Sequence, residues 1–296
     1  MATHLLVNPR AGSGERGLEF WRCRLAASGV ALSGCWEVGE DWQHLVESGD
    51  DLLVAGGDGT WHALLGECMR RSLRLGLLPS GTGNDLARSL GVPLDPQGAV
   101  EVIAAGGVRL IDLAEADGAF FVNVLHIGAG ATVSRTVATV HKRRWGRLAY
   151  LREIARKICQ RDGIHVQVCT GDGEDLHGRW LEVAVANGPS FGGGESVPGA
   201  AIDDGRLDLI AVPQLPVSHL LWHWVRAKLT RNIGSDNGGL VHLSSQSFHV
   251  QASGQPSVSM DGEPVEQVPR LIRVHRHALS VFITDSSADL GVQHAH

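Results

Sequence analysis

The residues with the clearest chemical potential lie in Val54-Ala-Gly-Gly-Asp-Gly-Thr-Trp-His62, directly after an apolar run. Glycines allow backbone N–H groups to approach an anion closely, and a helix that begins near Thr60 would point the positive end of its dipole at the same anion. The pattern therefore indicates a phosphate cradle, in which Asp58 requires a cation or a proton nearby. A tight Gly-Asp-Gly turn without a ligand is the structural alternative.

Two further glycine-rich turns have the same character. Asn8-Pro-Arg-Ala-Gly-Ser-Gly14 follows the first apolar run of the chain, and Ser80-Gly-Thr-Gly-Asn-Asp85 follows another. Because the carboxyl ends of parallel strands meet at one edge of a sheet, we expect the three turns to lie side by side. Three such turns are harder to explain as purely structural than one.

Two acidic clusters stand in the second half of the chain. A glycine-rich loop at 187–194 leads to Asp203-Asp-Gly-Arg-Leu-Asp208, where adjacent carboxylates and backbone carbonyls suit Mg²⁺. Met260-Asp-Gly-Glu-Pro264 sets Glu263 at a tight turn, from which a carboxylate can act as a general base. A hairpin turn without a ligand is the alternative for each cluster.

These residues need elements to position them, and the hydrophobic pattern changes near residue 120. Apolar runs that alternate with amphipathic stretches predict an open α/β domain over 1–119. Its expected strands are 5–7, 35–38, 52–55 and 75–78, and its expected helices are 15–28, 41–48, 60–71, 83–90 and 96–106. Short runs with Gly, Asp and Pro between them predict a β-rich domain over 120–276. The strands expected there are 119–127, 164–170, 179–187, 207–212, 247–252, 257–260 and 270–275.

Composition excludes several classes of protein. With 296 residues, 43% of them hydrophobic, the chain can bury a sizeable core and is long enough for two domains. A net charge of −6 provides no basic field for nucleic acid. Five cysteines without a CxxC pair argue against a disulfide framework or a zinc cluster and favour the reducing cytoplasm. No signal peptide is expected, and no run approaches the roughly 20 apolar residues of a membrane span.

Two segments of the second domain are basic and rich in tryptophan. Residues 141–161 carry eight Lys or Arg against one Glu, and residues 218–231 carry two Trp and three basic residues. Both suit an interfacial helix whose apolar face enters a bilayer while Lys and Arg meet anionic headgroups. The alternative is a packed amphipathic helix with a solvated basic face. The first interpretation predicts peripheral association with a membrane.

In order, the motifs GGDGT, GTGND, DDGxLD and DGE resemble those of the diacylglycerol kinase catalytic-domain family, which includes bacterial lipid kinases and the sphingosine and ceramide kinases. The resemblance runs from Asn8 to about Glu263. It implies an N-terminal open α/β nucleotide-binding domain, like those of NAD kinase and phosphofructokinase, followed by a β-sandwich lipid-binding domain at 120–276. It further implies that residues 277–290 return to complete the first domain.

The same resemblance implies a lipid kinase that uses ATP and Mg²⁺. Asp204, with the backbone carbonyls of Ala201 and Arg206, matches the family's Mg²⁺ site. Glu263 matches its proton acceptor, while Asp58 and Asp85 match acids near the phosphates, and Asp58 is the rival base. The implied ATP contacts are Asn8, Pro9, Arg10, Ala11, Gly12, Gly56, Gly57, Asp58, Gly59, Thr60, Trp61, His62 and Thr82.

Three positions depart from the family's pattern. His62 and Ala63 stand where an Asn and a Glu are usual, and Cys35 stands where a Thr near the adenosine is common. The changes at His62 and Ala63 leave a catalytically impaired nucleotide- or membrane-binding regulator open as an alternative. A kinase of a soluble acceptor, of the NAD kinase type, is a further alternative because it shares the GGDGT motif. The pattern does not select among diacylglycerol, phosphatidylglycerol, sphingoid bases and ceramide. Exposed sheet edges also leave a homodimer open.

Overall fold

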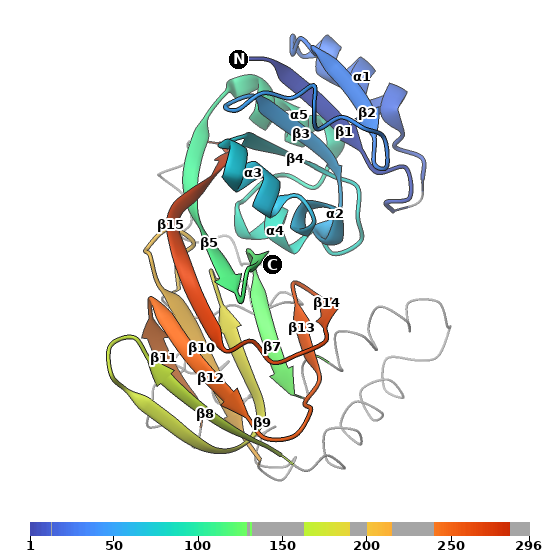
Figure 1. Cartoon of the computed structure of the whole chain (residues 1–296). Coiled ribbons are helices and arrows are strands. Elements are labelled where there is room, and N and C mark those ends of the chain that lie inside the picture. Colours follow the sequence, from blue (N-terminus) through green and yellow to red (C-terminus); the bar gives the residue numbers. More distant parts are fainter. Residues whose placement is uncertain (13, 129–130, 132–162, 190–199, 215–239, 285–296) are drawn as a thin grey trace, which may run out of the picture. The chain divides into compact units, whose positions relative to one another are not determined.

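The structure, a computed structural model, describes residues 1–12, 14–128, 131, 163–189, 200–214 and 240–284 (Figure 1). Both basic segments, 141–161 and 218–231, lie outside the described residues. Ser13 and residues 190–194 of the glycine-rich loop at 187–194 also lie outside them. The chain divides into two compact units: Met1–Ile111 together with residues 277–284, and Asp112–Arg276. The division falls within strand β5 (Val108–Ala116) and within strand β15 (Leu271–Phe282).

The first unit is built on a parallel sheet with the strand order β2-β1-β3-β4. The last residues of β15 add to this sheet, since Ser280 and Val281 pair in parallel with β4. The strand β3 is buried along its whole length, as its continuous apolar run predicts. The strands are β1 (Thr3–Val7), β2 (Gly34–Glu37), β3 (Asp51–Gly56), β4 (Arg74–Pro79) and β15 (Leu271–Phe282).

Five helices connect or flank these strands: α1 (Leu18–Ala27), α2 (Asp58–His62), α3 (Leu65–Arg71), α4 (Asp85–Ser89) and α5 (Pro96–Ala105). Helix α1 packs on β1, β2 and α5, while α2 packs on β3 and α5 packs on β4. At α5, Asp95 accepts a hydrogen bond from Gly98 N–H, Pro96 is the first helical residue and Gly106 ends the helix at φ +74°. Local capping signals therefore agree with the observed bounds of α5.

The predicted helix at 41–48 is wrong. Residues 43–45 form turns. The Arg71 guanidinium donates hydrogen bonds to the backbone carbonyls of Gln43 (2.6 Å) and Val46 (2.9 Å). Trp42 and Val46 are buried, so the apolar spacing that suggests a helix instead anchors an irregular loop on the core. A long-range hydrogen-bond donor thus replaces the regular backbone ladder.

The predicted helix at 60–71 is two helices. Helix α2 begins at Asp58, earlier than predicted, and ends after five residues, and α3 begins at Leu65. Because α2 is so short, its dipole contributes little to anion binding. The helix predicted at 15–28 begins later than expected, since α1 starts at Leu18, four residues after Gly14.

The second unit is an antiparallel β-domain. Its strands are β5 (Val108–Ala116), β6 (Ala119–Phe121), β7 (Val124–Gly128), β8 (Ile164–Thr170), β9 (Asp175–Ala186), β10 (Leu207–Pro213), β11 (Val241–Ser245), β12 (Ser247–Ala252), β13 (Val258–Met260) and β14 (Glu263–Val265). The strand order β14-β13-β7-β9-β8-β12-β15 is extended by β10, which pairs with β9 and β11. The sequence pattern misses β5, β11 and β14; in particular, Glu263 begins a strand.

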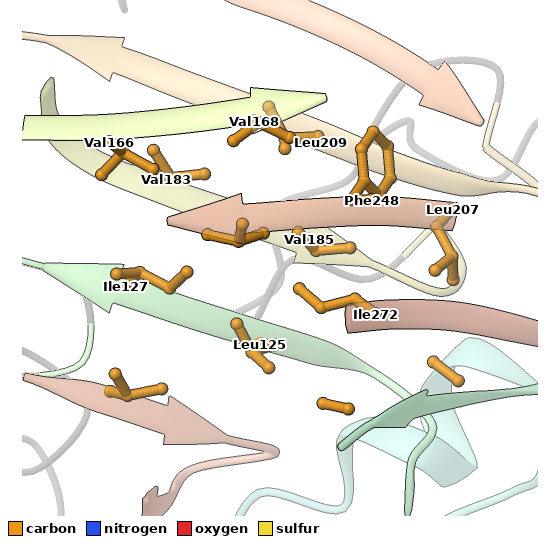
Figure 2. Close-up of a cluster of buried hydrophobic side chains, with 14 of the residues drawn as sticks. Leu125, Ile127, Val166, Val168, Val183, Val185, Leu207, Leu209, Phe248 and Ile272 are labelled. Carbon is orange, nitrogen blue, oxygen red and sulfur yellow. The ribbon is translucent and has the colours of Figure 1, made fainter. Parts of the chain in front are cut away.

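One face of this sheet forms the core of the second unit. Figure 2 shows side chains of several strands converging there, among them Leu125, Val168, Val185, Leu209 and Phe248. Along β8, Val166 and Val168 point inward while His165 and Gln167 are exposed, which is the period of two that the sequence predicts. The two-part fold class, α/β followed by a β-rich domain, is therefore confirmed.

A buried carboxylate ties the amino-terminal end of the chain to the first sheet. Asp50 accepts hydrogen bonds from the backbone N–H groups of Ala2 (2.7 Å) and Glu47 (3.0 Å), and His4 Nε2 lies 3.2 Å from it. Burial raises the pKa of Asp50, but these hydrogen bonds outweigh it and hold the pKa below the ordinary value. The ionised carboxylate therefore stabilises the fold.

We expect Asp50→Asn to lower the free energy of unfolding at pH 7 by about 1–3 kcal/mol, because a backbone N–H group loses its acceptor. A depressed pKa contributes stability above the unfolded-state value of about 4, and this is lost as pH falls through the folded-state pKa. The difference between wild type and variant should therefore shrink at low pH. Thermal unfolding across pH measures this, with Asp41→Asn, at an exposed side chain, as the control. A difference that does not vary with pH would contradict it.

Candidate active site

Three glycine-rich turns follow the carboxyl ends of β1, β3 and β4, which are neighbours in the sheet. Backbone hydrogen bonds join them directly: Asn8 N–H donates to Ala55 O (2.8 Å), and the N–H groups of Ser80 (2.7 Å) and Gly81 (3.1 Å) donate to Gly56 O. The structure therefore brings together the turns that the sequence places at one sheet edge.

Glycine is required at this edge because backbone packs on backbone. A Cβ atom added to Gly81 would lie 2.7 Å from the Cα atom of Gly57, and one added to Gly57 would lie 3.0 Å from the Cα atom of Gly81. A Cβ atom on Gly12, which has φ +63°, would overlap the Ser80 carbonyl oxygen. Only glycines allow the turns to close in this way, which is how a cradle for a phosphate anion is built.

Asp58 links two of the turns. Its Oδ1 atom accepts a hydrogen bond from the N–H group of Leu86 (3.1 Å), the second residue of α4. A Cβ atom built on Gly83 would lie 2.9 Å from Asp58 Oδ2 and 4.0 Å from Asp85 Oδ2, so both carboxylates border the same glycine. Two carboxylates that border the same residue are suited to act on a common cation.

The first turn is held to α2 by Asn8. Asn8 Nδ2 donates to Thr60 Oγ1 (2.8 Å), and Asn8 Oδ1 accepts from Arg10 N–H (3.0 Å). The remaining predicted nucleotide contacts of this turn and of the third turn are half-buried or exposed, which keeps them accessible: Pro9, Arg10, Ala11, Gly12 and Thr82.

Two predicted positions have a different environment from the turns. The Trp61 indole is fully buried and donates through Nε1 to Val54 O (3.1 Å), so its side chain belongs to the core. Cys35 lies in the edge strand β2 and lines a pocket of about 350 Å³ with Arg22 and Ala26 of α1. Burial raises the pKa of the Cys35 thiol. His62 is half-buried at the end of α2 and Ala63 is exposed.

In the second unit, Asp204 is exposed and accepts a hydrogen bond from Arg206 N–H (2.9 Å). Partial burial, together with the neighbouring charges of Asp208 and Asp112, raises the pKa of Asp204 above its ordinary value. This concentration of negative charge fits a divalent cation, which would neutralise it. Among the described residues, no three His, Cys, Asp or Glu side chains are grouped to hold a metal ion, so a cation here needs backbone carbonyls as well.

Asp112 is a functional candidate that the sequence analysis misses. It is fully buried, and its Oδ2 atom accepts a hydrogen bond from Gly205 N–H (2.5 Å), in the turn that carries Asp204. Gly205 has φ +74°, and a Cβ atom there would overlap Arg276. The shape of this turn therefore depends on Asp112, which lies 92 residues before Asp204 in the sequence.

Glu263 is exposed at the start of β14, opposite Met260. In the part of the chain that the structure describes, its side chain makes no hydrogen bond or ion pair, which leaves the carboxylate able to accept a proton. Its neighbour Asp261 is used differently, because its carboxylate accepts hydrogen bonds from three backbone N–H groups, those of residues 122, 123 and 124.

Asn84 is a further residue that the sequence analysis passes over, inside the GTGND motif. It adopts φ +53°, and its carboxamide accepts from Gly81 N–H (3.1 Å) and donates to Gly81 O (2.8 Å). Asn tolerates this left-handed conformation better than most residues, and that is a signal which could have identified it. For Asp112 and Asp261 no local signal exists, since their partners are distant in sequence.

Comparison with known proteins decides the family. Residues 2–116 match the model described as the diacylglycerol kinase catalytic domain, and residues 123–283 match the model described as the YegS C-terminal NAD kinase beta sandwich-like domain. The chain belongs to the diacylglycerol kinase catalytic-domain family. The resemblance inferred from the motifs is thereby confirmed, and the chain is a kinase by family.

Individual relatives agree. A protein of Pseudomonas fluorescens named probable lipid kinase YegS-like is 33% identical over 265 residues, which are 86% of each chain. One of Pseudomonas syringae pv. tomato with the same name is 32% identical over 270 residues, covering 86% of this chain and 84% of its own. The crystal structure of a diacylglycerol kinase from Bacillus anthracis has a TM-score of 0.78 at 26% identity, over 97% of this chain and 98% of its own.

More distantly, an NAD kinase from Archaeoglobus fulgidus shares the fold, with a TM-score of 0.51 at 15% identity over 96% of this chain and 94% of its own. This neighbour confirms the expected likeness to NAD kinase in architecture. In the described part of the chain, every helix is too short or too polar to cross a bilayer.

We expect Gly81→Ala to weaken ATP binding at least tenfold, because its Cβ atom would force the second and third turns apart, a strain of about 1–3 kcal/mol. Calorimetric titration with ATP measures the affinity. Gly17→Ala is the control, since a Cβ atom there meets no atom within 4 Å. Unchanged ATP affinity in Gly81→Ala would remove the cradle from the nucleotide site.

Proposed function

We propose that the protein transfers the γ-phosphate of ATP to a hydroxyl group of a membrane lipid. The observation that supports this proposal most is the cradle itself, at the carboxyl edge of a parallel sheet. Gly57 packs on Gly81 and Gly12 on the Ser80 carbonyl, with Asp58 and Asp85 beside them. The names of the relatives, probable lipid kinase and diacylglycerol kinase, support a lipid as the acceptor.

Phosphoryl transfer proceeds through a loose transition state, so a kinase mainly holds donor and acceptor in line and balances charge. The three turns would hold the phosphates of ATP with their backbone N–H groups, since no side chain stands between Gly57 and Gly81 where the second and third turns meet. Asn8 and Thr60 would keep the first two turns in register through their hydrogen bond. The Trp61 side chain is buried in the core, so a contact of Trp61 with the nucleotide would be made by its backbone.

Magnesium is the cation that we propose for the Asp204 turn, with the Asp204 carboxylate and the carbonyls of Ala201 and Arg206 as ligands. The bound ion would neutralise the surplus of negative charge there. Asp112 would keep the turn in shape through its hydrogen bond to Gly205 N–H. The Arg206 side chain is occupied elsewhere, since its Nε atom donates to Ser244 Oγ (3.0 Å).

We assign the role of general base to Glu263 rather than to Asp58. The Glu263 carboxylate is exposed, whereas Asp58 already accepts a hydrogen bond from Leu86 N–H and borders a second carboxylate, Asp85. Asp58 and Asp85 then organise cation and water near the phosphates. A base accepts the proton of the lipid hydroxyl as the oxygen attacks phosphorus, which contributes about 10²- to 10⁴-fold to the rate.

The reaction belongs at a membrane surface in the cytoplasm, where both ATP and lipid are available. The basic, tryptophan-containing segments of the sequence support peripheral association, because such segments bind anionic headgroups. We therefore expect activity on lipid vesicles to rise with their anionic fraction and to fall with salt.

We expect Glu263→Gln to lower kcat for lipid phosphorylation by about 10²- to 10⁴-fold with little change in the KM for ATP. Production of ADP with dispersed diacylglycerol, phosphatidylglycerol, sphingosine or ceramide, and with NAD as a soluble acceptor, measures both the role and the substrate. Glu266→Gln, at another exposed acid three residues away, is the control. Wild-type turnover in Glu263→Gln would transfer the role of base to Asp58, and a preference for NAD would overturn the lipid assignment.

A further inference from the structure

We propose that Asp261 is a positioning residue that fixes Glu263 by clamping its hairpin to the start of β7. The inference rests on the proposed function, since it acts through the assigned base. Its evidence lies in the backbone of the second unit, in hydrogen bonds that join segments about 140 residues apart in sequence.

The hairpin that carries Glu263 has little stability of its own. Strands β13 and β14 are three residues long each, and β14 is the last strand at its end of the sheet. An isolated two-stranded hairpin is marginal at best in water. Strand β13 joins the hairpin to the sheet by pairing with β7 over three residue pairs. Asp261 at φ +48° and Gly262 at φ +88° form a two-residue turn of type I′, which sets the local path of the chain but does not anchor the turn.

Asp261 adds an attachment at the turn itself, beyond the pairing of β13 with β7. Its Oδ2 atom accepts from Val122 N–H (2.9 Å), and its Oδ1 atom accepts from the N–H groups of Asn123 (2.9 Å) and Val124 (3.0 Å). Asp261 N–H donates in turn to Val124 O (2.9 Å). Three successive N–H groups that converge on one anion make a strong, directional clamp, because each hydrogen bond is charge-assisted.

Glu263 follows Asp261 by two positions in the chain, so the hydrogen bonds of Asp261 restrain the backbone that carries Glu263. The Glu263 side chain makes no hydrogen bond or ion pair with the described residues, so its carboxylate is placed by the hairpin alone. A general base must lie within hydrogen-bonding distance of the proton that it accepts, and a displacement of about 1 Å can cost 10²-fold in rate. Loosening the clamp should therefore lower kcat more than it affects nucleotide binding.

The chain contains a matched control for this interaction. Asp117 and Gly118, at φ +47° and +93°, form the same type of turn between β5 and β6. The Asp117 carboxylate accepts from the N–H groups of Arg270 (2.8 Å) and Leu271 (3.0 Å), and Asp117 N–H donates to Leu271 O (3.1 Å). This turn carries Ala119 where the other carries Glu263, so it shares the clamp without the catalytic side chain.

We expect Asp261→Asn to lower kcat by about 10- to 100-fold, with the KM for ATP within about twofold of wild type. Asp117→Asn, which weakens the same kind of clamp, should lower the unfolding temperature to a similar extent and leave kcat within about twofold. In the Glu263→Gln background, Asp261→Asn should slow the residual rate by less than about threefold, since the group it positions is already absent. Wild-type kcat in Asp261→Asn, an equal loss of kcat in Asp117→Asn, or full additivity with Glu263→Gln would each overturn the proposal.

Amide hydrogen exchange provides a readout that does not depend on activity. In Asp261→Asn the amides of Val122, Asn123 and Val124 should exchange at least about tenfold faster, because the acceptor is weakened and opening of the hairpin becomes more frequent. Unchanged exchange there would overturn the clamp. If the wild type phosphorylates no lipid, the proposed function fails by itself, and the exchange result still decides whether Asp261 holds the hairpin.

Discussion

The close approach of two glycine backbones, Gly57 and Gly81, is the constraint on which the first unit's site depends. No side chain stands between them, so the turn after β4 can donate hydrogen bonds from Ser80 N–H and Gly81 N–H to Gly56 O at the end of β3. Asp58 then reaches Leu86 N–H, and Asn84 closes its own turn on Gly81. A side chain at either glycine would disturb these contacts together, because they share the same few atoms of backbone.

In the second unit, carboxylates on backbone N–H groups have the corresponding role. Asp112, Asp117 and Asp261 each hold a turn by accepting hydrogen bonds from distant backbone. Asp204 and Glu263 lie next to such turns and are exposed. The carboxylates of Asp112, Asp117 and Asp261 are thus engaged by distant backbone N–H groups, whereas those of Asp204 and Glu263 are the ones available for a cation or a proton.

The sequence predicts the strands and the turns of the site because their signals are local. Continuous apolar runs identify β3 and β4, and the glycine-rich motifs follow them directly. The failure at 41–48 has a non-local cause, because Arg71 takes the carbonyls that a helix there would use. The core likewise takes the Trp61 side chain, which its position in the motif does not indicate. The sequence likewise identifies Glu263 but not Asp261, because the partners of Asp261 lie at residues 122–124. Motif spacing indicates which residues share a turn, whereas long-range hydrogen bonds decide which of them hold it.

Transfer of the terminal phosphate from ATP to lipid is the claim on which the assigned roles depend, and label transfer tests it most directly. The protein is incubated with ATP labelled in its γ-phosphate, Mg²⁺ and anionic vesicles that contain one hydroxylated lipid, and the organic and aqueous phases are then separated. We expect labelled lipid in the organic phase, and only when the protein is present. Label found only in ATP and inorganic phosphate, or on NAD when NAD is supplied, would contradict it.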